Sequence, residues 1–188
     1  MDKIKSDIKS MLTPKRYKHI LGVEEVAIEL ACKYGANLEK VRKAALLHDC
    51  SKQFTITKMR ELCDCDETLK NYGHLGELIH GFAGSVYAKM KFGITDQEIL
   101  DAIKYHTIGR RDMSLVEKIT YLADAIEPNR DYADVEHIRH LAFENIDMAI
   151  LHEADRKIEY LIKREAVIHP NTVDMRNWLL AKVKRGEV

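Results

Sequence analysis

Nine histidines are the residues of this 188-residue sequence most suited to chemistry at neutral pH. Helical spacing puts four of them on apolar faces of separate predicted helices: His19, His48, His80 and His106. Any one of them is explained most simply as a core histidine bonded to a neighbour. Four together, with Asp49 carried inward by the apolar run AALLH, favour a shared metal site, because burying imidazoles without partners costs free energy.

The other acidic and histidine positions give weaker signals. Asp124 lies off the apolar stripe of its predicted helix, so spacing alone does not bring it to the four histidines. The other five histidines have polar surroundings, and four of these are expected at the surface: His74, His137, His140 and His152.

Imidazole and carboxylate ligands without cysteine suit iron, manganese, zinc, cobalt or nickel. Such cations lower the pKa of a bound water toward neutrality. No serine or cysteine beside a matched base stands out as an alternative nucleophile. The residues therefore predict a metal-dependent hydrolase.

Basic residues near the candidate ligands could bind an anionic substrate. They are Arg16, Lys52, Arg110 and Arg130. Because lysine and arginine make up 30 of the 188 residues, such neighbours also arise by chance. Arg16 has the strongest case, since it lies one helical turn from His19 on the same face, and Arg110 has the weakest.

Helix start and stop signals recur along the chain, and no segment alternates as a strand would. Thr13–Pro14 predicts a helix start, Gly35 its end, and Asn37 caps the next segment, LEKVRKAALLHDCSK. Further predicted boundaries are capping boxes at Thr95-x-x-Glu98 and Ser114-x-x-Glu117, a stop at Pro128, a start at Asp134, and helices over 76–92, 147–165 and 172–184. The polar CDCDETLKN segment, residues 63–71, is predicted to be a loop, and Glu24, Glu25 and Glu29 are expected to face water.

Composition agrees with an all-α fold in a single domain, residues 1–188. The formal net charge is zero, so no general affinity for nucleic acid or membranes is expected. The first residues, MDKIKSDIKSMLTPKRYKH, contain no apolar signal core, and the four cysteines show no disulfide framework. We therefore expect reduced thiols and a cytoplasmic location.

The order His19, His48–Asp49 and Asp124 resembles the H…HD…D pattern of the HD superfamily of metal-dependent phosphohydrolases. The segments RYKH, LLHDCSK, IHGFAG, YHTIGR and ADAIEPNR are similar to the branch of symmetrical bis(5′-nucleosyl)-tetraphosphatases. The resemblance runs from Arg16 to about Thr172. Cys50 departs from it, because a bulkier residue is expected after the HD pair.

The resemblance implies a single-domain HD-type helical bundle with two metals, with iron as the native metal. One metal would be bound by His19, His48, Asp49 and Asp124, and the second by His80 and His106 with Asp49 bridging. Two divalent cations against two carboxylates would leave the site positive and suited to a polyphosphate. The substrate implied is diadenosine tetraphosphate, cut at its centre into two ADP.

The same resemblance implies residue roles. Asp49, Lys52 and Arg130 would be catalytic, and the six metal ligands would also contact the substrate. The further nucleotide contacts implied are Arg16, Lys52, Thr107, Arg130 and the segment Val167, Ile168, His169, Pro170, Asn171 and Thr172.

Three alternatives stay open from the sequence. One is an HD phosphohydrolase that acts on nucleoside mono- or triphosphates. Another is a nucleotide-sensing module with little turnover, and the last is a structural bundle with incidental histidines. Two further points are open: whether His80 and His106 bind a second metal or contact only the substrate, so that the site holds one ion or two, and the oligomeric state, including a possible homodimer.

Overall fold

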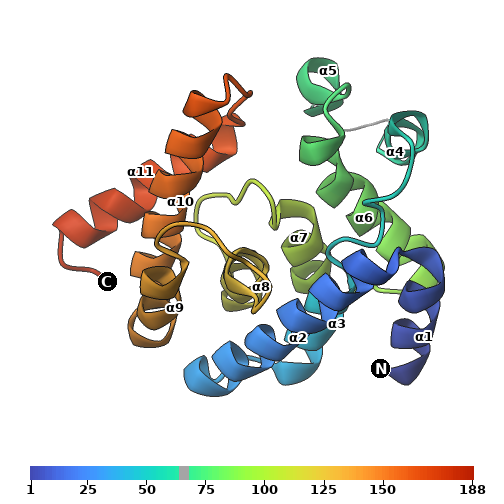
Figure 1. Ribbon diagram of the computed structural model, residues 1–188, viewed down its shortest axis with the longest axis horizontal. Helices are drawn as coiled ribbons and strands as arrows, with labels where there is room; N and C mark the ends of the chain where they lie inside the picture. Colours follow the sequence, from blue (N-terminus) through green and yellow to red (C-terminus); the bar gives the residue numbers. More distant parts are fainter. Residues whose placement is uncertain (64–67) are drawn as a thin grey trace.

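The computed structural model describes residues 1–63 and 68–188, with side chains outside 64–69, and contains helices and no strands over that part of the chain (Figure 1). The helices are α1 (Asp2–Met11), α2 (Pro14–Tyr34), α3 (Leu38–Leu47), α4 (Ile56–Leu62), α5 (Thr68–Tyr72), α6 (Gly76–Phe92), α7 (Gln97–Tyr105), α8 (Leu115–Ile126), α9 (Val135–Glu144), α10 (Ile146–Lys163) and α11 (Pro170–Lys184). The predicted all-α fold class is confirmed.

Helices α2, α3, α7 and α8 form the centre of the molecule, with α4–α6 on one side and α9–α11 on the other (Figure 1). Helix α2 packs on α3 and α8, and α7 packs on α3, α6 and α8. The main hydrophobic core lies between these helices and includes the fully buried Ile20, Leu47, Ile103, Ile119 and Leu122. No helix in the described ranges has the length and apolarity that a membrane span needs.

Most predicted helix boundaries agree with the structure. The Thr13 side chain accepts a hydrogen bond from the backbone of Arg16 at the start of α2, and Gly35 ends this helix with a φ of 68°. The capping box at Ser114 is present at the start of α8. That helix ends at Ile126, before Pro128, as the steric restriction on the residue preceding proline requires.

Several boundaries differ from the prediction. The cap of α7 is Asp96, whose carboxylate accepts from two backbone N–H groups, and the predicted box at Thr95 is wrong. Helix α3 stops at Leu47 instead of continuing to Lys52, and the chain then turns with a bond from Lys52 N to Asp49 O. Helices α1 and α4 were not predicted.

The expected loop over residues 63–71 is wrong for residues 68–71, which belong to α5, and its residues 64–67 lie outside the described part. Cys32 and Cys50 are free thiols, Cys63 donates to the carbonyl of Met59 at 2.8 Å, and Cys65 lies in the undescribed segment.

Glu24 is a further correction, because it is buried and not solvated. Its carboxylate lies 2.6 Å from the ammonium of Lys5 on α1 and 2.9 Å from the guanidinium of Arg42 on α3. The ion pairs satisfy the buried charge. Glu25 and Glu29 are exposed as expected.

Candidate metal centre

Five helices bring the six predicted ligands together. His19 lies inside α2 and His80 inside α6, while His48 and His106 are the C-cap residues that directly follow α3 and α7. Asp49 follows His48 directly, and Asp124 lies in the last turn of α8. The four histidines and Asp49 are buried, and the Asp124 side chain is 22% exposed, so the site opens to solvent beside Asp124.

The Nδ1 atoms of all four histidines face hydrogen-bond acceptors. Three of them face carbonyl oxygens of their own helices, at 2.7 Å for His48, 2.8 Å for His106 and 3.2 Å for His80. The Nδ1 of His19 lies 3.1 Å from a carboxylate oxygen of Glu127. Because these oxygens can only accept, they favour the tautomers with the proton on Nδ1 and a free lone pair on Nε2.

The four Nε2 atoms converge in two pairs. They are 3.3 Å apart between His19 and His48, and 3.0 Å apart between His80 and His106. Two nitrogens bound at a right angle to one cation at about 2.1 Å would be about 3.0 Å apart. Two unprotonated nitrogens at this distance have no proton to share, so the arrangement fits shared coordination of a cation.

Asp49 lies between the two histidine pairs. Its Oδ1 is 3.2 Å from Nε2 of His80 and 3.7 Å from that of His106. Its Oδ2 is 3.6 Å from Nε2 of His48 and 3.8 Å from that of His19. Each carboxylate oxygen thus faces one pair, which is the geometry that a bridging ligand requires.

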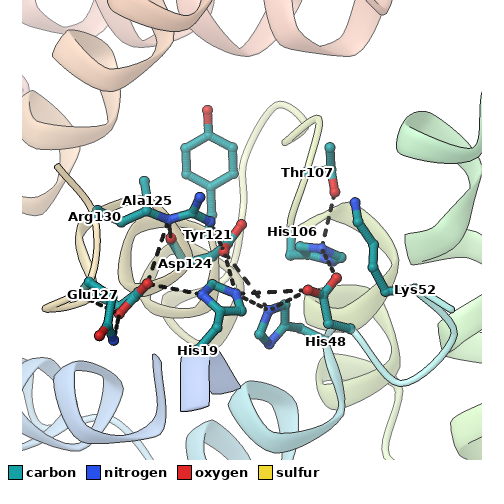
Figure 2. Close-up of polar contacts among 12 residues, drawn as sticks. His19, His48, Lys52, His106, Thr107, Tyr121, Asp124, Ala125, Glu127 and Arg130 are labelled. Atoms are coloured by element: carbon teal, nitrogen blue, oxygen red, sulfur yellow. Dashed lines mark hydrogen bonds and ion pairs between the residues drawn. The ribbon is translucent and has the colours of Figure 1, made fainter. Parts of the chain in front are cut away.

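Asp124 joins the His19–His48 pair, although its spacing did not predict this. Its Oδ1 is 3.1 Å from Nε2 of His19 and 3.9 Å from that of His48 (Figure 2). Helix α8 packs against both α2 and α3, and this packing brings the carboxylate to the histidines.

The HD domain family matches residues 16–129 of this chain, a range that contains all six of these residues. The chain belongs to the HD family. It is 40% identical to the symmetrical bis(5′-nucleosyl)-tetraphosphatase of Halalkalibacterium halodurans, over 94% of this chain and 95% of that protein. It is 36% identical to the protein of the same name in Bacillus subtilis, over 93% of this chain and 94% of that protein.

A solved structure is also similar. It is described as a predicted HD superfamily hydrolase involved in NAD metabolism, from Clostridium acetobutylicum, and superimposes with a TM-score of 0.92. The sequence identity is 40%, covering 96% of this chain and 97% of that one. The HD fold and the buried His/Asp cluster together make this chain a divalent-metal-dependent phosphohydrolase.

The protonation states in the HD site suit metal binding. Burial lowers the pKa of His48 to about 4 and lowers that of His80. Burial raises the pKa of the Asp49 and Asp124 carboxyls, but the nearby histidines outweigh it and hold both pKa values well below the ordinary range. Neutral imidazoles and ionised carboxylates are the forms that bind a cation.

His19 differs from the other histidines of the HD site. Burial lowers its pKa, but the carboxylates of Asp124, Glu127 and Asp49 outweigh burial, so the pKa is raised. Without a cation His19 therefore holds a proton more readily than His48 does, and a bound cation must displace that proton.

The predicted basic residues lie at the edge of the HD site. Arg16 Nη1 is 2.7 Å from Asp49 Oδ2, and Arg130 Nη2 is 2.6 Å from Asp124 Oδ1. Lys52 Nζ is 2.7 Å from Glu77 Oε2 and 3.4 Å from the His80 ring. These cations contact ligands or their neighbours, so they lie where a polyphosphate bound to the metals would reach.

Arg110 has another role. It donates to both oxygens of buried Glu117, at 2.6 and 2.9 Å, and to Asp101 at 3.2 Å. These bonds tie α8 to α7 and account for this arginine without a substrate.

The other predicted contacts lie on two segments. The Thr107 hydroxyl is 3.0 Å from Nε2 of His106 and 3.2 Å from that of His80. Thr172 is buried and donates to the carbonyl of Ile108 at 2.8 Å, which brings the start of α11 next to Thr107.

Within residues 167–172 the side chains are unequal in their exposure. His169 is buried, caps α11 by accepting from Asn171 N, and lies with its ring centroid 4.9 Å from that of Tyr72. Val167 and Pro170 are exposed, and Ile168 is half-buried.

Glu127 was missed by the sequence interpretation. It is 2% exposed, binds His19 at 3.1 Å, and accepts from the backbone and side-chain nitrogens of Asn129, both at 2.7 Å (Figure 2). A signal was present, since Glu127 stands in ADAIEPNR directly after a helix end. Its distance of 108 residues from His19 concealed the contact.

Proposed function

We propose that this HD protein hydrolyses diadenosine tetraphosphate symmetrically to two ADP, at a centre of two divalent metals bound by His19, His48, Asp49, His80, His106 and Asp124. The observation that carries the proposal is the position of Asp49 between two pairs of converging imidazole nitrogens. Three bacterial relatives at 36–40% identity are named symmetrical bis(5′-nucleosyl)-tetraphosphatases, and each aligns over at least 93% of both chains.

When bound, two divalent cations supply Lewis acidity, activate a water and neutralise phosphate charge. The protein holds the Asp49 carboxylate between the two histidine pairs, where it would serve both cations, because Asp49 is buried and contacts both pairs. Lys52 and Arg130 are assigned to the phosphoryl oxygens, where charge develops in the transition state.

Substrate binding is assigned to residues around the metals. Arg16 turns its guanidinium toward Asp49 and can grip a phosphate in bidentate fashion. Thr107 offers a hydroxyl beside His80 and His106. The segment 167–172 is assigned to the nucleoside, because Thr172 fastens it beside Thr107.

Iron is the metal we propose, because an imidazole–carboxylate set suits it and the family resemblance implies it. Elemental analysis of protein purified without chelators tests this identity. The wider setting we propose is one HD domain over residues 1–188, a cytoplasmic location, and a small-molecule nucleotide as the partner with no nucleic acid or membrane.

Chromatography of the products tests the reaction. Diadenosine tetraphosphate should give ADP alone, and reaction in oxygen-18 water should place one label in one of the two ADP molecules. ATP plus AMP would reject symmetrical cleavage. A panel with nucleoside mono- and triphosphates tests the other HD reactions, and NAD belongs in it because the Clostridium acetobutylicum structure is described as involved in NAD metabolism. Nucleotide binding without turnover would instead support a sensing module.

A further inference from the structure

The turn Glu127–Arg130 follows α8 and carries two side chains of the site. Glu127 binds Nδ1 of His19, and Arg130 binds Oδ1 of Asp124 (Figure 2). Two metal ligands from different helices therefore depend on one four-residue turn. Any displacement of this turn would move both contacts together.

Arg139 of α9 fastens this turn. Its Nε donates to the carbonyl of Ile126 at 2.9 Å, and its Nη2 donates to the carbonyls of Glu127 at 2.8 Å and Arg130 at 3.0 Å. The side chain is 24% exposed, so most of it is inside the protein. One guanidinium thus binds the end of α8 and both ends of the turn.

The chemistry of these bonds requires a guanidinium. The last carbonyls of a helix have no partner within the helix, and α8 ends at Ile126. A guanidinium holds its donors in a rigid planar fork, so Nε and Nη2 reach separate carbonyls at once. A lysine has one nitrogen in place of two and cannot reproduce that span.

Helix α2 also packs closely against this turn. A Cβ at Gly22 would lie 2.7 Å from Oε2 of Glu127 and 3.3 Å from Cδ of Pro128. Only glycine lets α2 approach this closely. The turn therefore contacts both α2, at Gly22, and Arg139 of α9, and these contacts restrain it relative to His19.

We propose that Arg139 is a positioning residue of the metal centre. Through Glu127 it fixes the ring of His19, and through Arg130 it fixes the carboxylate of Asp124. The claim about metal affinity rests on the metal site of the proposed function, and it does not depend on which nucleotide is cleaved. Arg139 itself contacts neither ligand, so its effect is transmitted by the turn.

Arg139→Lys tests the proposal, with Arg42→Lys as the matched control. Arg42 also donates from Nε and Nη2, at 3.1 and 2.9 Å, but to Glu24 and not to the turn. Outer contacts of metal ligands are worth about 10- to 100-fold in affinity, so Arg139→Lys should weaken binding of Mn²⁺ or Fe²⁺ by about that factor in chelator competition. Arg42→Lys should lower the Tm and leave metal affinity within about twofold of wild type.

The proposal would be overturned if Arg139→Lys bound metal as tightly as Arg42→Lys and had the same KM for diadenosine tetraphosphate. Both arginines would then be only structural. Should Arg139→Lys fold poorly, Arg139→Ala assayed with added ethylguanidinium replaces it. Recovery of metal affinity with ethylguanidinium supports positioning, and no recovery in folded protein contradicts it. Failure of the proposed function is a separate result, since wild-type protein would then bind metal but leave diadenosine tetraphosphate intact.

Discussion

Glu127→Gln is the perturbation whose effect the structure defines most closely. The carboxylate accepts three hydrogen bonds: one from His19 Nδ1 at Oε1, and two from Asn129 at Oε2. Glutamine has the same shape but one acceptor and one donor group in place of two acceptors. Either orientation of the amide must therefore set a donor against a donor or change the tautomer of His19.

The size of the effect follows from these two orientations. With its NH2 toward Asn129, the glutamine loses both hydrogen bonds from the N–H donors of this exposed residue, at about 0.5–1.5 kcal/mol each. With its NH2 toward His19, the ring must accept at Nδ1 and carry its proton on Nε2, which removes the lone pair that faces His48. We expect the second orientation, and a loss of metal affinity of about 10- to 100-fold, equivalent to about 1.4–2.7 kcal/mol.

Chelator competition measures the affinity, and nitrogen-15 chemical shifts of the metal-free protein report which nitrogen of His19 carries the proton. Glu24→Gln is the control, since Glu24 is equally buried on α2 but pairs with Arg42 and Lys5. Wild-type metal affinity in Glu127→Gln would refute the reasoning, as would an unchanged His19 tautomer alongside weakened metal binding.

Three more predictions concern the same site. Asp49→Asn should lose metal from both histidine pairs, and its activity with it, because a neutral amide is a poor bridge between two cations. Elemental analysis showing full metal content would contradict this. Arg16→Ala should raise KM for diadenosine tetraphosphate or lower kcat while metal content stays near wild type, whereas His19→Ala should reduce both; a metal-free Arg16→Ala protein would make Arg16 structural. In metal-free protein His48 should contribute a fall of about 3 kcal/mol in the free energy of unfolding from pH 6.5 to pH 4, since unfolded His48 binds a proton near its ordinary pKa of 6.5 and folded His48 only near about 4. The raised pKa of His19 acts in the opposite direction, so urea titrations at several pH values compare wild type with His48→Gln, and equal slopes in the two proteins would show that His48 is not buried neutral.

Local signals in the sequence determined most of the helices. The caps at Thr13, Asn37 and Ser114 and the glycines after α2 and α6 act within one turn of the chain, so they can be recognised without knowledge of the fold. Adjacent polar residues can each cap a helix, and α7 is capped by Asp96 instead of the predicted Thr95.

The inward direction of His19, His48, His80 and His106 was also readable, because each continues an apolar stripe of its own helix. Asp49 followed from its place after AALLH. These are properties of one helix at a time, and the period of the helix is enough to assign them.

Only the tertiary structure decided which groups meet. Asp124 lies off its stripe and reaches His19 because α8 packs on α2 and α3. Glu127 reaches His19 across 108 residues of sequence. Arg139, on α9, binds the backbone of the turn Glu127–Arg130. Glu24 likewise became buried because α1 and α3 supply its partners. Helical periodicity gives the direction of a side chain relative to its own axis, whereas these contacts depend on how separate axes cross, and that is set by packing between distant segments.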